Sequence, residues 1–490
     1  MRALLPLGLA AVAGLVLAGC LAANDNDDGD GPAIDPRVAN HVTETNPQRV
    51  ADPKKDFSTV IDTDHGAPGL HTVRALHGGS SGLDLVGYND LTDKINPGTV
   101  GTGWGAAGLW HQYACVAAWL GTTAIAIVDL SDVAHPTVVS QTDDPLVNGD
   151  CQFTADGNYL FAGAYLSAAG TAGLENTPAC FTTLFPRGCP GGGGINVWDV
   201  HDKANPRHIL FTDTGEYHTL QVHTDPKTNL TYVIQAYSGH IYAFDPSVPD
   251  LVEQTQVQPM EHDMWIGKHP LTGHYYLYTG NGSGFNAYTF DDPTHPELAG
   301  TWQPDDSQPD QQGGGCCGWH RQAQMDTLVD GKAILVVAGE DCGGGNGLPY
   351  FAIDISDVSN PTTISSFEVP GHVQADTNAA HLCEFTTHEF SIYDGYVITA
   401  NYHAGAWLFD IGTPERLAHP VTLGYYVPAT EPATADLPTS LTGAQDLTWP
   451  WNPFVWGAFF DERGYAVVGD FSSGMYLLGI PGVSGVTPAA

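Results

Sequence analysis

The chain has 490 residues, of which 42% are hydrophobic, and its 16 basic and 55 acidic residues give a net charge of -39 at pH 7. Such a charge repels phosphate backbones and anionic lipid headgroups, which argues against nucleic acid as a partner. The 58 glycines and 34 prolines indicate many turns between short strands, so we expect an all-β fold. The acidic balance is also typical of a halophilic protein.

The N-terminal residues 1–19 predict a lipoprotein signal peptide. Arg2 supplies the positive start, and the apolar stretch after it is too short to cross a bilayer comfortably. Positions 17–20 read Leu-Ala-Gly-Cys, which resembles the lipobox of prokaryotic lipoproteins and implies lipid attachment at Cys20. Residues 20–69 are then a lipidated acidic tether and N-terminal extension. We expect a cell-surface protein facing outside, held to the membrane by its lipid anchor only. The alternative is a plain secretory signal.

An apolar strand that ends in Asp recurs at intervals of about 46 to 70 residues, the period of a propeller blade with variable loops. The six copies with the terminal aspartate end at Asp129, Asp199, Asp245, Asp291, Asp354 and Asp410. A seventh copy ends at Gly479 instead. We therefore predict a single seven-bladed β-propeller over residues 70–482, followed by a C-terminal tail at 483–490.

Each copy predicts a blade of four antiparallel strands. In the third copy the strands are expected at 218–224, 230–237, 240–245 and 251–257. Hairpins between the first two strands are marked by the pairs Asp156-Gly157, Asp330-Gly331 and Asp394-Gly395. The chain stops after the third strand of the seventh blade. Residues 83–90 are therefore expected to supply the missing fourth strand and to remove an exposed sheet edge.

The sequences that start at Asp129 (Asp-Leu-Ser-Asp) and at Asp354 (Asp-Ile-Ser-Asp) resemble the LVIVD-repeat family of bacterial and archaeal surface propellers. The resemblance covers about residues 70–482. It implies the propeller fold and a surface lipoprotein, and it implies little about activity. Gly479 departs from the repeat in the seventh copy.

Histidines recur near the start of the predicted innermost strands. His218, His262 and His388 each precede the same apolar position by four residues, and in blade 5 Gln324 holds that position with His320 four residues before it. Innermost strands line the channel of a propeller, so these imidazoles are expected at one mouth. Three or four of them could hold Zn, Fe or Cu with a coordination position open. The acidic composition leaves Ca open as well. The alternative is a structural histidine that bonds between blades.

The long predicted loops join outer to innermost strands or second to third strands, and these loops share one face of a propeller. This looped face is the face that carries the histidines, and loops on a rigid scaffold commonly carry function. Candidate ligand-contacting residues on it are Gln324, Glu389, Trp451 and Trp456.

Once Cys20 is lipidated, eight cysteines remain, an even number that predicts disulfides in an exported protein. The first expected pair is Cys180 with Cys189, which bracket a short loop, and Cys115 with Cys151 could join neighbouring blades. The pairing among Cys316, Cys317, Cys342 and Cys383 stays open.

Two functions fit these features. The first is a monomeric, non-enzymatic surface propeller that binds an extracellular protein or small ligand with its looped face. The second is a metal-dependent oxidoreductase or hydrolase that uses the channel histidines. A purely structural role in the cell envelope is a third possibility. No nucleophile or general-base signature identifies a catalytic residue.

The charge predicts a salt-dependent stability. Because acidic side chains repel one another most strongly where screening is weak, the melting temperature should rise from dilute buffer to molar salt. Thermal unfolding followed by circular dichroism measures the shift, and a melting temperature that stays constant or falls contradicts the prediction.

Overall fold

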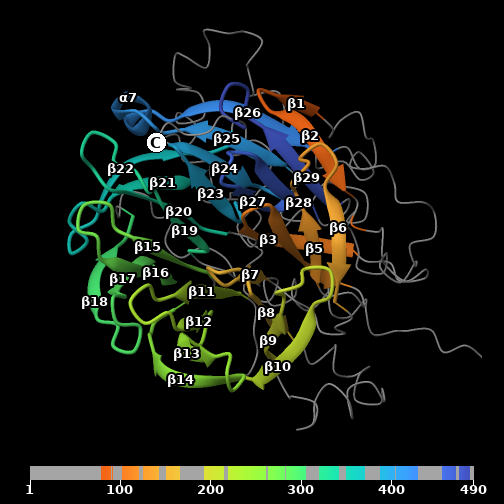
Figure 1. The fold of residues 1–490 in the computed structure, drawn as a ribbon. Coiled ribbons are helices and arrows are strands. Elements are labelled where there is room, and N and C mark those ends of the chain that lie inside the picture. Colours follow the sequence, from red (N-terminus) through yellow and green to blue (C-terminus); the bar gives the residue numbers. More distant parts are fainter. Residues whose placement is uncertain are drawn as a thin grey trace, which may run out of the picture.

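The computed structural model is a seven-bladed β-propeller (Figure 1). It describes residues 79–89, 91, 102–120, 125–142, 150–165, 193–214, 219–260, 263–281, 283–304, 319–340, 349–369, 387–402, 404–428, 455–470 and 474–485. The signal peptide, Cys20 and the whole of the proposed tether and N-terminal extension at 20–69 lie outside these residues. None of the helices among the described residues is long and apolar enough to cross a membrane.

The blades follow one another along the chain, and their strands run from the axis outward in sequence order. Blade 1 consists of β3 (Thr102–Trp110), β4 (Tyr113–Leu120), β5 (Ile125–Asp129) and β6 (Thr137–Gln141). Blade 2 consists of β7 (Cys151–Phe153), β8 (Tyr159–Tyr165), β9 (Gly193–Asp199) and β10 (Arg207–Asp213). Blade 3 consists of β11 (Leu220–Thr224), β12 (Thr231–Gln235), β13 (His240–Asp245) and β14 (Asp250–Gln256).

The next two blades repeat this order. Blade 4 consists of β15 (Met264–Lys268), β16 (Tyr275–Asn281), β17 (Gly284–Thr289) and β18 (Leu298–Trp302). Blade 5 consists of β19 (Arg321–Gln324), β20 (Ile334–Ala338), β21 (Tyr350–Asp354) and β22 (Thr362–Phe367).

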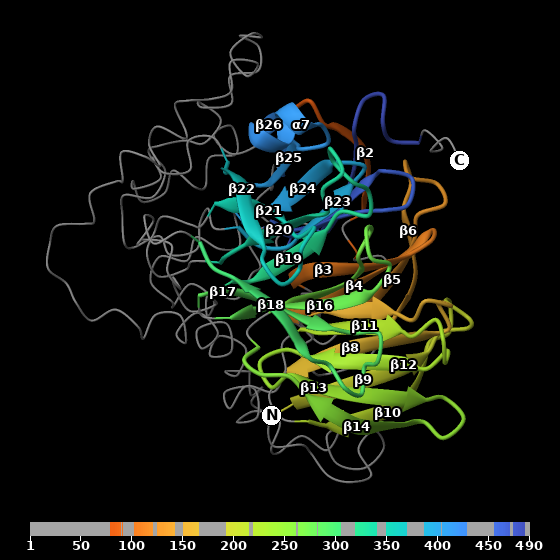
Figure 2. The ribbon, with the colours of Figure 1, turned by 90° about the vertical axis from the view of Figure 1, so that its left-hand side faces the viewer.

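The last two blades include strands from the N-terminal part. Blade 6 consists of β23 (Phe390–Tyr393), β24 (Tyr396–Ala400), β25 (Ala406–Asp410), β26 (Val421–Val427) and β1 (Gly79–Ser81). Blade 7 consists of β27 (Val455–Phe460), β28 (Ala466–Asp470), β29 (Gly474–Gly479) and β2 (Asp84–Asn89). The short helix α7 (Pro414–Ala418) lies at the rim of the ring, far from the inner strands (Figure 2).

The ring closes as the sequence predicts, because β2 pairs antiparallel with β29 as the outer strand of blade 7. Asn89 joins this strand to blade 1. Its amide nitrogen donates to the carbonyl of Pro136 at 2.8 Å, and its side-chain oxygen accepts from the backbone N–H of Leu91 at 2.7 Å. The fifth strand of blade 6, β1, was not predicted from the sequence. It covers β26 with only three residues.

The hydrophobic core is divided among the seven contacts between neighbouring blades, each with its own cluster of buried side chains. The cluster between blades 7 and 1 joins Leu91, Met475 and Leu477 to Val116 and Val128. The middle strands are covered on both faces by adjacent blades, which explains why they read as continuous apolar runs. The innermost strands lie beside one another all the way round the axis.

The aspartate that ends the third strand of the repeat has a local structural role. In blades 1, 3 and 5 a side-chain oxygen of Asp129, Asp245 or Asp354 accepts from the backbone N–H two residues later, at 2.8, 2.8 and 2.9 Å. This bond starts the turn toward the outer strand. The predicted Asp-Gly hairpins are also present: Asp394 and Gly395 join β23 to β24 with φ of 47° and 80°, as a type I′ turn requires.

One disulfide is present in the part of the chain that the structure describes. It joins Cys115 on β4 to Cys151 on β7, which confirms the predicted link between neighbouring blades. The six other candidate cysteines, Cys180, Cys189, Cys316, Cys317, Cys342 and Cys383, lie outside the described residues.

The closure can be tested at Leu91, which is fully buried between blades 7 and 1. Leu91→Ala should lower the free energy of unfolding by about 2–5 kcal/mol, because it removes apolar contacts and leaves a cavity. Urea unfolding measures this loss. Leu85→Ala is the control, since Leu85 lies on β2 but is 50% exposed, and it should cost less than about 1 kcal/mol. Equal losses would contradict the assigned closure.

Candidate functional site

Five consecutive blades place one residue each at an equivalent position at the start of the innermost strand. Each of these residues lies opposite an equivalent residue of the second strand in its own blade. Backbone N–H groups of the second strand donate to backbone carbonyls of the first, from Gly163 to Asp150, from Ala236 to Thr219, from Gly280 to Asp263 and from Ala400 to Glu389. In blade 5, Arg321 pairs with Ala338. We call this set the axial tier, and it consists of Asp150, Thr219, Asp263, Arg321 and Glu389. All five are buried.

The axial tier holds three carboxyl groups and one guanidinium. Arg321 is nearest to Asp263, with 3.7 Å between Nη1 and Oδ2, and its guanidinium also lies 5.5 Å from the ring centres of Trp265 and Phe459. Asp263 lies close enough to Glu389 for its charge to raise the pKa of the Glu389 carboxyl. Oε2 of Glu389 has no hydrogen-bond partner among the described residues.

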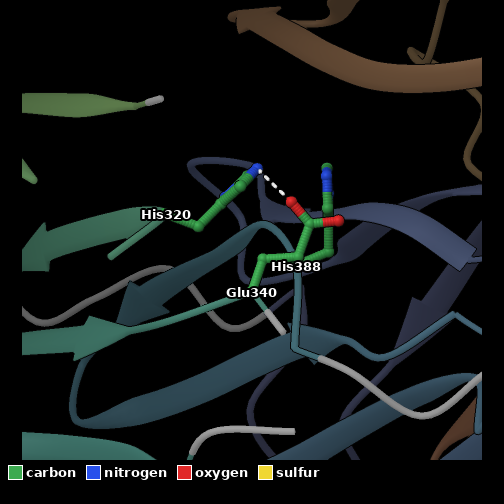
Figure 3. Close-up of side chains that lie close together, drawn as sticks. All are labelled: His320, Glu340 and His388. Atoms are coloured by element: carbon green, nitrogen blue, oxygen red, sulfur yellow. Dashed lines mark ion pairs between the residues drawn. The ribbon is translucent and has the colours of Figure 1, made fainter. Parts of the chain in front are cut away.

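The positions just before the axial tier carry histidines in blades 5 and 6. His320 precedes Arg321 and His388 precedes Glu389, so the strand register makes the two histidines equivalent. Their ring centres are 4.2 Å apart. Glu340, which follows β20, brings its Oε2 to 3.5 Å from Nε2 of His320. Figure 3 shows these three side chains turned toward one another. One ligand atom from each lies within 4.8 Å of the others.

Each member of this trio, His320, Glu340 and His388, has a further polar group close by. Nδ1 of His388 is 2.6 Å from the carbonyl oxygen of Trp456, and Nδ1 of His320 is 3.6 Å from Oδ2 of Asp263. The hydroxyl of Tyr402 donates to Oε1 of Glu340. The rings of Trp456 and Tyr402 also pack beside the His388 ring, at 4.0 and 5.2 Å.

The burial of so many acidic groups perturbs their protonation. The pKa of Asp150 is raised to about 7, first by loss of hydration and then by the charge of Asp263, while Arg321 opposes the shift. The pKa of the Glu389 carboxyl is raised well above its usual range, first by burial and then by Asp263. The axial tier therefore holds three carboxyl groups against one guanidinium, and burial favours the protonated form of Asp150 and Glu389.

The structure brings together some of the residues that the sequence singled out. His320, His388, Glu389 and Trp456 meet at this site. Gln324 does not, because it lies at the opposite end of β19 from His320, where its side chain bonds to the carbonyl of Lys268 and to Tyr278. His218, His262 and Trp451 lie outside the described residues.

Two important residues were missed because only the innermost strands were compared. Glu340 and Tyr402 stand two residues after Ala338 and Ala400, which are equivalent ends of the second strands β20 and β24. The loops that follow second strands lie on the same face as the starts of the innermost strands. Comparing the residues after each second strand would therefore have identified both.

The comparisons with known proteins add little beyond the fold. No family model matches the chain, and no curated protein matches it. The chain is similar to a solved Lactobacillus plantarum protein with a TM-score of 0.43, 11% identity and 65% and 83% of the two chains covered. It is also similar to the WD40 β-propeller domain of Doa1, with a TM-score of 0.41, 8% identity and 78% and 98% of the two chains covered. For Kuenenia stuttgartiensis hydrazine synthase the TM-score is 0.47, the identity 10% and the coverage 81% and 100% of the two chains. These low values carry nothing about activity.

The shifted pKa of Asp150 gives a testable pH dependence. Its raised pKa means that the folded protein holds a proton that the unfolded chain releases, so this contribution to stability is lost as the pH rises from about 4 to about 7. Asp150→Asn keeps the shape without the charge. Its free energy of unfolding should therefore improve relative to the parent protein across that window.

Urea unfolding at pH 5 and at pH 8 measures the difference. The exposed substitution Asp250→Asn is the control and should follow the parent. A parallel pH dependence of Asp150→Asn and the parent protein would rule out the assignment.

Proposed function

We propose that this protein is an exported, lipid-anchored propeller that binds a positively charged ligand at the end of its axis where the axial tier lies. The N-terminal lipobox-like sequence and the resemblance to the LVIVD-repeat surface propellers support the export and the anchor. The ligand reaches the site from outside the cell, through the face on which the innermost strands begin.

The observation that carries the proposal is the charge gathered at this end of the axis. Four carboxyl groups are buried there, those of Asp150, Asp263, Glu340 and Glu389, against the single guanidinium of Arg321. A buried carboxylate without full compensation is costly, because the low dielectric of the interior strengthens repulsion between like charges. A cation bound among these groups would relieve that repulsion.

The position of the charges favours binding over a role in holding the blades together. Blade contacts are already made by the seven apolar clusters, and a buried group of mostly like charges weakens a fold. Pockets at the mouths of rigid β-structures are common ligand sites. The alternative of a metal-dependent oxidoreductase or hydrolase has one feature in its favour, the meeting of two imidazoles and a carboxylate.

The binding proposal can be tested with cationic probes of different chemistry. Ca²⁺, Zn²⁺, spermidine and choline are each added to the detergent-solubilised full chain at constant ionic strength, and the melting temperature is recorded. At about 100 times its Kd a specific ligand adds about 2.7 kcal/mol of stability. At least one probe should raise the melting temperature of the parent protein.

The variant Glu389→Gln should lose most of that rise, because it cannot become the carboxylate that a bound cation would stabilise, while it keeps the shape of a protonated carboxyl group. Glu297→Gln, an exposed substitution, controls for general attraction to the acidic surface and should respond like the parent. A rise that is equal in all three proteins, or absent in all, would refute the site.

A further inference from the structure

We propose that His320, Glu340 and His388 form a binding site for a divalent first-row transition metal such as Zn²⁺. This inference rests on the proposed cation-binding function and names the class of cation. It draws on the geometry of three side chains that come from two neighbouring blades.

The ligand atoms are close to the arrangement that a metal needs. Zinc binds nitrogen and carboxylate oxygen at about 2.0–2.2 Å, which puts ligand atoms about 3–4 Å from one another. Nε2 of His320 and Oε2 of Glu340 are 3.5 Å apart, and the ligand atoms of all three residues lie within 4.8 Å. A small side-chain movement is enough to bring the His388 nitrogen within about 3–4 Å of the other two ligand atoms.

Hydrogen bonding selects the nitrogen that each imidazole presents. A carbonyl oxygen can only accept, so Nδ1 of His388, 2.6 Å from the oxygen of Trp456, carries the proton and leaves Nε2 as the donor to a metal. Nδ1 of His320 faces the Asp263 carboxylate at 3.6 Å, while its Nε2 faces Glu340. A ring nitrogen directed at a carbonyl or carboxylate, with the other directed at the ion, is the usual arrangement of metal-binding histidines.

The third ligand is oriented in the same way. Tyr402 donates its hydroxyl proton to Oε1 of Glu340, which leaves Oε2 turned toward His320. The backbone of Tyr402 has φ of 44° and forms a bridge with Val455 on blade 7. A residue other than glycine is held in this left-handed conformation only when its surroundings enforce it. Tyr402 is therefore a positioning residue for Glu340.

The donor set identifies the class of metal. Two imidazole nitrogens and one carboxylate oxygen suit Zn²⁺, Fe²⁺ or Co²⁺, whereas Ca²⁺ and Mg²⁺ prefer oxygen ligands alone. A site with three protein ligands leaves room for a water molecule or a substrate on the metal. The negative axial tier beside it, with Asp263 in contact with His320, favours a doubly charged ion. The competing interpretation is an ion pair between protonated His320 and Glu340 that needs no metal.

The test uses the detergent-solubilised full chain after chelator treatment, titrated with Zn²⁺ by calorimetry and with Co²⁺ by visible absorption. We expect one equivalent of metal per chain and the d–d bands of a Co²⁺ ion with nitrogen ligands. Glu340→Gln should weaken Zn²⁺ binding by at least about 100-fold, and Tyr402→Phe by about 10-fold, as expected for loss of an orienting contact. Glu297→Gln should bind like the parent.

X-ray absorption of the zinc-loaded parent protein keeps the test decisive even if a variant fails to fold, because it should detect two imidazole ligands. Absence of Co²⁺ bands, absence of imidazole scattering, or Zn²⁺ binding that Glu340→Gln does not change would each overturn the metal site. If spermidine, choline or Ca²⁺ still binds in a way that depends on Glu389, the proposed cation-binding function survives that failure. If no probe binds, both proposals fall.

Discussion

Contact between neighbouring blades is the constraint on which the rest of this structure depends. Each blade has two apolar faces, and the middle strands of a blade are buried only if another blade lies against each of them. The ring therefore has to close. Asn89 and Leu91, at and just after the end of strand β2 in blade 7, make the contacts that join blade 7 to blade 1, so that each of the seven blades has a neighbour on both faces.

Closure of the ring also explains how the site forms. Residues that are separated by about one blade period in the sequence become neighbours around the axis, because every innermost strand begins at the same level. Side chains of the same kind at that position in several blades therefore lie together in one small volume at the axis. Asp150, Asp263 and Glu389 each stand alone in the sequence, yet their burial around Arg321 makes one electrostatic unit.

The buried carboxyl groups of the site lower the stability of the fold, and this cost is an argument that the site has a function. Buried carboxyl groups with raised pKa values destabilise the folded chain at neutral pH, while the repeat elsewhere uses aspartate to form stable turns at the rim. The same residue type therefore has opposite effects in two places. Folds generally accept such local costs where a binding site needs them, and the orienting contacts of His320, Glu340 and His388 fit that explanation.

The sequence by itself determined the seven-bladed fold and the closure by 83–90, because these follow from the strand period, the turn residues and the need to cover sheet edges. It offered Cys115 and Cys151 as a pair that could join neighbouring blades, and the structure shows that bond. It also pointed to His320 and His388. Only the tertiary structure decided that Glu340 and Tyr402 join them and that Gln324 does not. Glu340 and Tyr402 hold equivalent positions after their second strands, but the side chains that they meet depend on how blades 5 and 6 pack, which a strand pattern does not encode.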